Sequence, residues 1–152
     1  MLQWWIQEPL LLATGNPTDE LLAALRRHGF GVIVSLLDDR QLPAYDTARA
    51  TDAGWIRHKI PVADGGTPSV QQMDEFVQLV RTLPAGAKAL VHCETGGSRS
   101  GVMGAAYWVD HGLPVAEAIA RVCASNPEVQ ITPERKEALE RFAACGLSPV
   151  RS

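Results

Sequence analysis

The segment that most limits how this chain can fold is the run from His92 to Gly101, which reads HCETGGSRSG. The apolar run 89–91 before it predicts a short buried strand, and the small-residue run 102–109 after it predicts a helix. A loop between a strand and a helix start directs backbone N–H groups to one point, where the helix dipole also favours negative charge. The sequence therefore predicts an anion cradle in this loop.

Two side chains make this cradle a chemical site. Cys93 begins the loop, and its thiol should lose its proton readily because the N–H donors and a guanidinium both stabilise the thiolate. Arg99 ends the loop and can hold two phosphate oxygens in a bidentate fork, which a lysine cannot do. Gly96 and Gly97 allow the backbone to curl with its N–H groups inward. Ser100 follows, where its hydroxyl can donate to the thiolate.

The loop resembles the signature H-C-x-x-G-x-x-R-S of the cysteine-based protein tyrosine phosphatases. The matching residues are His92, Cys93, Gly96, Arg99 and Ser100. The likeness covers most of the chain, from the region of Pro9 to that of Cys145, and is to the small dual-specificity branch of that superfamily. It implies a phosphate monoester hydrolase that works through a cysteinyl-phosphate intermediate.

The resemblance also implies a role for each residue of the loop. Cys93 attacks phosphorus, Arg99 and the backbone N–H groups hold the equatorial oxygens, and Ser100 stabilises the cysteine as it leaves. The phosphate-binding residues are then Glu94, Thr95, Gly96, Gly97, Ser98 and Arg99. His92 orders the loop and supports the thiolate without titrating in the reaction. The resemblance implies no metal and no organic cofactor, since the loop supplies the positive field itself.

A second informative segment is 61–68, PVADGGTP, in which Asp64 lies between two prolines and is followed by two glycines. It resembles the general-acid loop of the small dual-specificity enzymes. Asp64 is therefore expected to protonate the leaving oxygen and then to accept a proton from the attacking water. Asp38 and Asp39 are rivals, because they follow the predicted strand 32–37 on the same rim of the sheet. Their alternative role is a helix N-cap with a solvated neighbour.

Three further side chains stay open at the level of sequence. The segment 129–134 resembles the loop that positions water in some phosphatases, but Gln130 lies one residue earlier than the glutamine of the tyrosine-specific branch. Cys123 is expected in the core and Cys145 at a helix end. Either one can act as a resolving thiol only if it lies near Cys93.

The remaining chain alternates strand and helix patterns. Strands are predicted at 4–6, 10–13, 32–37, 55–60 and 89–91, and helices from 19 to 28, 41 to 53, after Ser69, from 102 to 111, 115 to 124, and from Pro133 onward. This alternation predicts an α/β fold: a mostly parallel, twisted sheet of four to five strands with helices on both faces. Trp4 and Trp5 are expected to fill the core or a sheet edge.

Composition sets the broad class of protein. Length, 46% apolar residues and 20% charged residues suit one globular catalytic domain over residues 1–152. A net charge of −3 gives no reason to expect nucleic acid, and no apolar run is long enough to span a membrane. Three cysteines and no signal-peptide pattern indicate a reducing compartment. We therefore expect a cytoplasmic monomer that acts on a phosphorylated protein or a small phosphoester.

Three alternatives remain beside the protein phosphatase. The first is a catalytically weak, phosphatase-like module that binds phosphate. The second is a phosphatase of a non-protein substrate such as an inositol phosphate or phosphoinositide, which is less favoured because the loop carries Glu94 and no lysine. The third is a rhodanese-type sulfurtransferase, whose cysteine loop lacks the Arg-Ser-Gly run present here.

Overall fold

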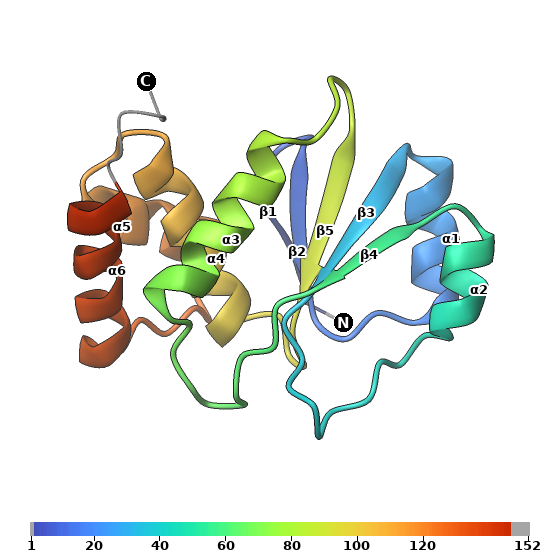
Figure 1. Ribbon diagram of the computed structural model, residues 1–152, viewed down its shortest axis with the longest axis horizontal. Coiled ribbons are helices and arrows are strands. Elements are labelled where there is room, and N and C mark those ends of the chain that lie inside the picture. Colours follow the sequence, from blue (N-terminus) through green and yellow to red (C-terminus); the bar gives the residue numbers. More distant parts are fainter. Residues whose placement is uncertain (1, 147–152) are drawn as a thin grey trace.

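One mixed sheet with helices on both faces organises residues 2–146, which are the residues that the computed structural model describes (Figure 1). The strands are β1 (Gln3–Gln7), β2 (Leu11–Thr14), β3 (Phe30–Ser35), β4 (Ile56–Lys59) and β5 (Lys88–His92). The helices are α1 (Asp19–Arg27), α2 (Thr47–Asp52), α3 (Val70–Arg81), α4 (Ser98–Asp110), α5 (Val115–Ser125) and α6 (Pro133–Gly146). This arrangement confirms the predicted α/β fold.

The strand order β1-β2-β5-β3-β4 brings the ends of four parallel strands to one rim. β1 is antiparallel to β2, whereas the pairs β2–β5, β5–β3 and β3–β4 are parallel. At this rim His92 is in register with Thr14 on one side and with Ser35 on the other. Because the loops that follow parallel strands leave from the same edge, the cysteine loop after β5 lies centrally among them.

The two faces of the sheet bury separate apolar clusters. Helices α3 to α6 cover one face, and α1 and α2 cover the other (Figure 1). Successive side chains of a strand point to opposite faces. Accordingly, Ala89 and Val91 of β5 belong to the cluster under α3 to α6, and Leu90 belongs to the cluster under α1 and α2. Cys93 continues this alternation and joins the larger cluster.

Two helix boundaries differ from the prediction. α4 begins at Ser98, four positions before the predicted start at 102, so Arg99 and Ser100 lie in its first turn. α2 covers only Thr47–Asp52, and the predicted helix from 41 to 46 is wrong. Tertiary hydrogen bonds replace it, because Ala44 N–H donates to Asn16 Oδ1 at 2.8 Å and the Gln41 side chain accepts from Arg99 at 2.8 Å.

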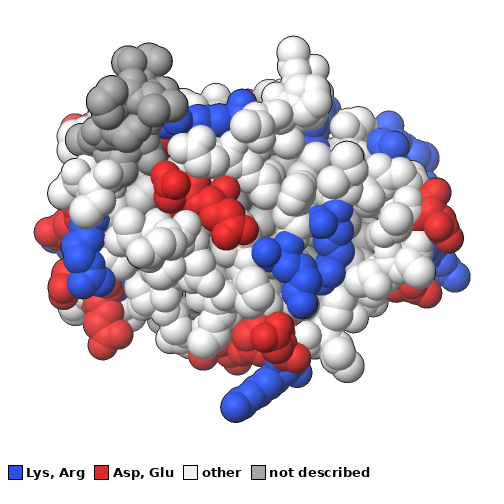
Figure 2. Space-filling model, in the orientation of Figure 1, with Lys and Arg blue, Asp and Glu red and all other residues white. Residues whose placement is uncertain are grey.

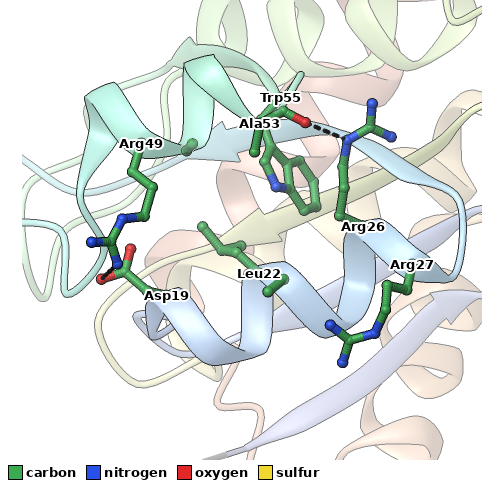
Figure 3. A pocket seen from close by; sticks show the side chains of 9 residues that line it. Asp19, Leu22, Arg26, Arg27, Arg49, Ala53 and Trp55 are labelled. Atoms are coloured by element: carbon green, nitrogen blue, oxygen red, sulfur yellow. Dashed lines mark hydrogen bonds and ion pairs between the residues drawn. The ribbon is translucent and has the colours of Figure 1, made fainter.

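A cleft of about 290 Å³ separates α1 from α2. Leu22 and Trp55 line it, and both indole and leucine side chains point into it (Figure 3). Arg26 Nε donates to the carbonyl of Ala53 at 3.0 Å across one end, and an Arg49–Asp19 ion pair of 3.9 Å spans the other. These two contacts bridge the helices α1 and α2. No residue of the segments 92–101 or 61–68 lines the cleft between them.

The surface in the view of Figure 2 carries acidic and basic side chains in small separate groups, and neither sign dominates it. Among residues 2–146, no helix combines the length and the apolar character that crossing a bilayer requires.

Candidate active site

Cys93 lies immediately after β5 and is only 1% exposed. Its Sγ accepts a hydrogen bond from the Gly96 backbone N–H at 3.3 Å and another from the Ser100 hydroxyl at 3.2 Å. Hydrogen bonds to the charged form of a group favour that form. The donors that the sequence places around this sulfur are therefore present, one from the loop and one from the first turn of α4.

The loop backbone packs tightly against the turn after β2. Gly96 adopts φ +88°, and a Cβ at this position would lie 2.5 Å from the backbone nitrogen of Gly15. Only glycine satisfies both conditions. The turn also holds the loop by hydrogen bonds, since Asn16 donates its N–H to the Glu94 carbonyl at 3.0 Å and its Nδ2 to the Glu94 carboxylate at 3.2 Å.

Arg99 is 2% exposed, and its guanidinium is held by groups from two other segments. Nη1 donates to the Leu36 carbonyl at 3.3 Å, to Gln41 Oε1 at 2.8 Å and to the Val62 carbonyl at 2.9 Å. Nη2 donates to Asp64 Oδ1 at 3.4 Å. Within residues 2–146 Nε has no hydrogen-bond partner, so the Nε–Nη2 edge is the one that can grip two phosphate oxygens.

Asp64 and Asp38 occupy different positions around this arginine. The Asp64 side chain is 70% exposed and reaches Arg99 through an ion pair of 3.4 Å. Asp38 Oδ2 accepts the backbone N–H of Asp64 at 3.0 Å, and its Oδ1 accepts that of Arg40 at 2.8 Å. These two hydrogen bonds hold the pKa of Asp38 below its usual value, the first more than the second. The geometry thus brings Asp64, not Asp38, to the arginine.

The alternative role for Asp38 and Asp39 as a helix N-cap and its neighbour is wrong, because no described helix begins beside them. Asp38 instead fixes the loop that carries Asp64. Asp39 is exposed and forms an ion pair with Lys59 at 3.7 Å.

His92 is fully buried beneath the loop, on the α1–α2 side of the sheet. Its Nε2 lies 2.9 Å from the Tyr45 hydroxyl, which also accepts from Arg57 Nε at 2.8 Å. The hydroxyl proton is therefore directed to Nε2, which leaves the ring proton on Nδ1, 3.4 Å from the Cys93 carbonyl. Burial lowers the pKa of His92 to about 4. The ring is thus neutral at neutral pH and lies against the carbonyl of Cys93.

The Gln130 side chain is exposed and, within residues 2–146, forms no hydrogen bond with the site. Its backbone carbonyl accepts from Arg135 Nη1 at 2.8 Å. Arg135 is 6% exposed and also donates from Nη2 to the Gly66 carbonyl at 3.4 Å. A buried cation thus connects the Gln130 segment to the loop of Asp64. The water-positioning role of Gln130 stays a prediction.

Sequence reasoning missed Asn16, Gln41, Tyr45 and Arg135 as residues of this region. Each belongs to a common residue type at a position without motif or periodicity, so no local signal distinguishes it. All three cysteines carry free thiols; the Cys123 side chain is directed to the Val129 carbonyl, and Cys145 is exposed. In the part of the chain that the structure describes, no group of three or more metal-ligating side chains occurs.

The fold and this site define the class of cysteine-dependent phosphatase domains. Residues 11–113 match the family described as "Polymorphic toxin system, DSP-PTPase phosphatase", and the chain belongs to this family. The match confirms the predicted superfamily and its dual-specificity branch.

Individual relatives agree with this assignment. The human dual specificity protein phosphatase CDC14C is 34% identical over 93 residues, which cover 60% of this chain and 20% of that protein. CDC14AB of Danio rerio is 32% identical over 120 residues, 78% of this chain and 19% of that protein. The chain thus spans about a fifth of the length of these curated relatives.

Solved structures confirm the fold. Tk-PTP in its active form superposes with a TM-score of 0.83 at 28% identity, covering 93% of this chain and 95% of that one. The human tyrosine phosphatase-like serine/threonine/tyrosine-interacting protein gives 0.82 at 19% identity, covering 96% and 98%. At that identity the second likeness concerns the fold alone.

Proposed function

We propose that this chain is a dual-specificity protein phosphatase that hydrolyses phosphotyrosine and phosphoserine or phosphothreonine through a cysteinyl-phosphate intermediate. The observation that carries the proposal is the arrangement around Cys93. Its sulfur accepts two hydrogen bonds, and the buried Arg99 stands at the end of the same loop with Asp64 at its guanidinium.

In the first step, Cys93 Sγ attacks phosphorus in line, and the bond from phosphorus to the ester oxygen breaks. Arg99 and the loop N–H groups, with those at the N-terminus of α4, stabilise the charge on the equatorial oxygens. Asp64, whose carboxyl group is exposed at the mouth of the site, donates a proton to the leaving oxygen.

In the second step, water attacks the cysteinyl-phosphate, and the S–P bond breaks. Asp64 accepts the proton of that water. Ser100 donates its hydrogen bond to the sulfur as it becomes a thiolate again, which the observed 3.2 Å contact supports. The neutral, buried His92 keeps the Cys93 backbone in place and exchanges no proton with substrate.

The substrate class rests on charge and on relatives. Glu94 is exposed in the loop, and an anionic side chain there disfavours a highly phosphorylated inositol ring. The relatives named above are dual specificity protein phosphatases. PTPMT1, solved in complex with PI(5)P, has a TM-score of 0.83 at 20% identity, a likeness of fold alone. Phosphoinositides are therefore the second candidate. We further propose a cytoplasmic monomer, which the three free thiols support.

The test is a time course with p-nitrophenyl phosphate, phosphotyrosine, phosphoserine and phosphothreonine peptides, soluble inositol phosphates and PI(5)P. We expect turnover of the aryl phosphate and of the phosphopeptides. If the inositol phosphates or PI(5)P are turned over faster than every phosphopeptide, the substrate class is a phosphoinositide or inositol phosphate and not a phosphoprotein. No turnover of any phosphoester, with intact phosphate binding, would establish the phosphate-binding module instead. Consumption of thiosulfate would establish the sulfurtransferase.

A further inference from the structure

Trp4, on the edge strand β1, touches the cysteine loop from the far end of the sequence. Its indole is 5% exposed, and Nε1 donates to the Gly96 carbonyl at 2.7 Å. Strand alternation separates it from its neighbour Trp5, which lies on the opposite face and stacks on Phe30 at a ring distance of 6.1 Å. Two adjacent tryptophans therefore differ in one respect that matters here: only Trp4 reaches the loop.

The peptide that Trp4 holds is one that glycine would otherwise leave free to rotate. Gly96 has φ +88°, and a glycine backbone exchanges between such conformations at little cost. The C=O of a planar trans peptide points opposite to the N–H of the next residue. Fixing the Gly96 carbonyl on the indole therefore directs the Gly97 N–H to the other side, away from Trp4.

The indole is itself held firmly. It packs in the cluster beneath α3 to α6, and a Cβ added at Gly104 of α4 would lie 3.3 Å from its Cη2 atom. The hydrogen bond to the loop thus comes from a donor wedged between β1 and the helix that follows the loop. Such a donor opposes rotation of the peptide without contacting a bound phosphate.

We propose that Trp4 is a positioning residue of the anion cradle, holding the 96–97 peptide with its N–H toward the bound phosphate and the thiolate. The inference rests on the proposed function, because it assumes that the cradle receives a phosphate group. Without the indole N–H, the peptide can turn its carbonyl inward, where the oxygen repels both phosphate and thiolate.

The experiment compares Trp4→Phe with Trp5→Phe, which also removes an indole N–H from β1 but on the other face. Cys93 is alkylated with iodoacetamide over a pH series, with and without inorganic phosphate, and its modification is followed by peptide mass spectrometry. Protection gives the phosphate dissociation constant, and neither readout requires turnover. For Trp4→Phe we expect about three- to tenfold weaker phosphate binding and an alkylation midpoint higher by roughly half to one pH unit. Trp5→Phe should match the wild type.

A second variant separates the hydrogen bond from the packing. Replacing Trp4 with 3-benzothienylalanine keeps the ring volume and removes only the N–H donor, so it decides the question even if Trp4→Phe does not fold. The proposal is overturned if this variant retains the wild-type phosphate constant and alkylation midpoint. If phosphate fails to protect wild-type Cys93, the proposed function is wrong, and the shift of the alkylation midpoint alone still decides the role of Trp4.

Discussion

The two loops that meet at Arg99 are built in opposite ways. In the loop 92–101, Cys93, Arg99 and Ser100 are all at most 2% exposed, and its backbone is bonded to β1 and to the turn after β2. In the loop 61–68, the Asp64 side chain is 70% exposed, and a Cβ on Gly65 would meet no atom within 4 Å. The first loop buries its cysteine, arginine and serine, whereas the second leaves its aspartate side chain largely in solvent.

The difference fits two different tasks in the proposed reaction. Stabilising charge in a transition state requires donors that are already in place, because reorganising them would add to the barrier. A proton donor must instead admit the substrate and then approach the leaving oxygen, which suits an exposed loop. The contacts of the second loop with Asp38, Gln72 and Arg135 limit its positions without burying its carboxylate.

Replacing the nucleophile should have the largest effect. Cys93→Ser should lower p-nitrophenyl phosphate turnover by at least about 10⁴-fold, since the proposed mechanism passes through a covalent bond to the Cys93 sulfur. Steady-state kinetics and circular dichroism would separate lost chemistry from lost fold. Cys123→Ser, at a half-buried position outside the site, is the matched control. Residual turnover of Cys93→Ser within tenfold of the wild type would reject the mechanism.

Arg99→Lys tests whether the packed loop depends on geometry or only on charge. The lysine keeps the cation but not the bidentate fork, so kcat/KM should fall by about two orders of magnitude or more. Arg49→Lys, in the exposed ion pair with Asp19, serves as the control and should be near wild type. If Arg99→Lys has wild-type kinetics, the side chain of Arg99 does not bind the phosphate group.

The role of Asp64 in the loop 61–68 is tested by comparing substrates with good and poor leaving groups. Asp64→Asn should slow a poor leaving group, as in a serine phosphate peptide, by about a hundredfold, and p-nitrophenyl phosphate much less. It should also flatten the alkaline limb of the pH–rate profile and leave the acidic limb in place. Asp38→Asn and Asp39→Asn should cause at most modest losses that do not depend on the leaving group. If Asp38→Asn or Asp39→Asn changes that dependence and Asp64→Asn does not, the strand-end carboxylate is the acid.

The buried His92, at the start of the loop 92–101, predicts that the free energy of unfolding depends on pH. Burial lowers the pKa of His92 from 6.5 to about 4. Between pH 6.5 and pH 4 the His92 ring is therefore protonated in the unfolded chain but neutral in the folded chain. Stability contributed by the neutral ring is therefore complete above pH 6.5 and is lost as the pH falls toward 4. The loss should reach roughly 3 kcal/mol. Urea unfolding across this range should show it in wild type and in the control His58→Asn, and not in His92→Asn.

The smallest effect concerns the far end of the exposed loop. Ser69 caps α3 by accepting the Gln72 N–H at 3.0 Å, and the Gln72 side chain bonds back to the Ser69 N–H. Ser69→Ala should lower the free energy of unfolding by about 1 kcal/mol. Turnover should change by less than about twofold, since the cap fixes the helix and not Asp64. A tenfold loss of turnover would mean that the exposed loop needs a rigid end.

Much of the molecule follows from local sequence signals. The run HCETGGSRSG predicts that Cys93 and Ser100 meet, because their chemistry and spacing are both local, and the structure shows this contact. The loop 61–68 singles out Asp64 in the same way, and the structure places it at Arg99. The strands and most helices also follow, since apolar periodicity and start signals such as Ser69 before α3 and Pro133 at the first position of α6 lie within a few residues of those elements. These signals also specify the alternation of strands and helices, and with it the parallel sheet.

Only the tertiary structure decides which distant groups support the site. Gln41 meets Arg99 across 58 positions, Arg135 meets Gly66 across 69, and Trp4 meets Gly96 across 92. The order β1-β2-β5-β3-β4 places these segments together, and a hydrogen bond needs only the right donor at the right point in space. A sequence pattern records periodicity and spacing along the chain, so it can specify the strand that carries Cys93 but not the indole that holds its loop.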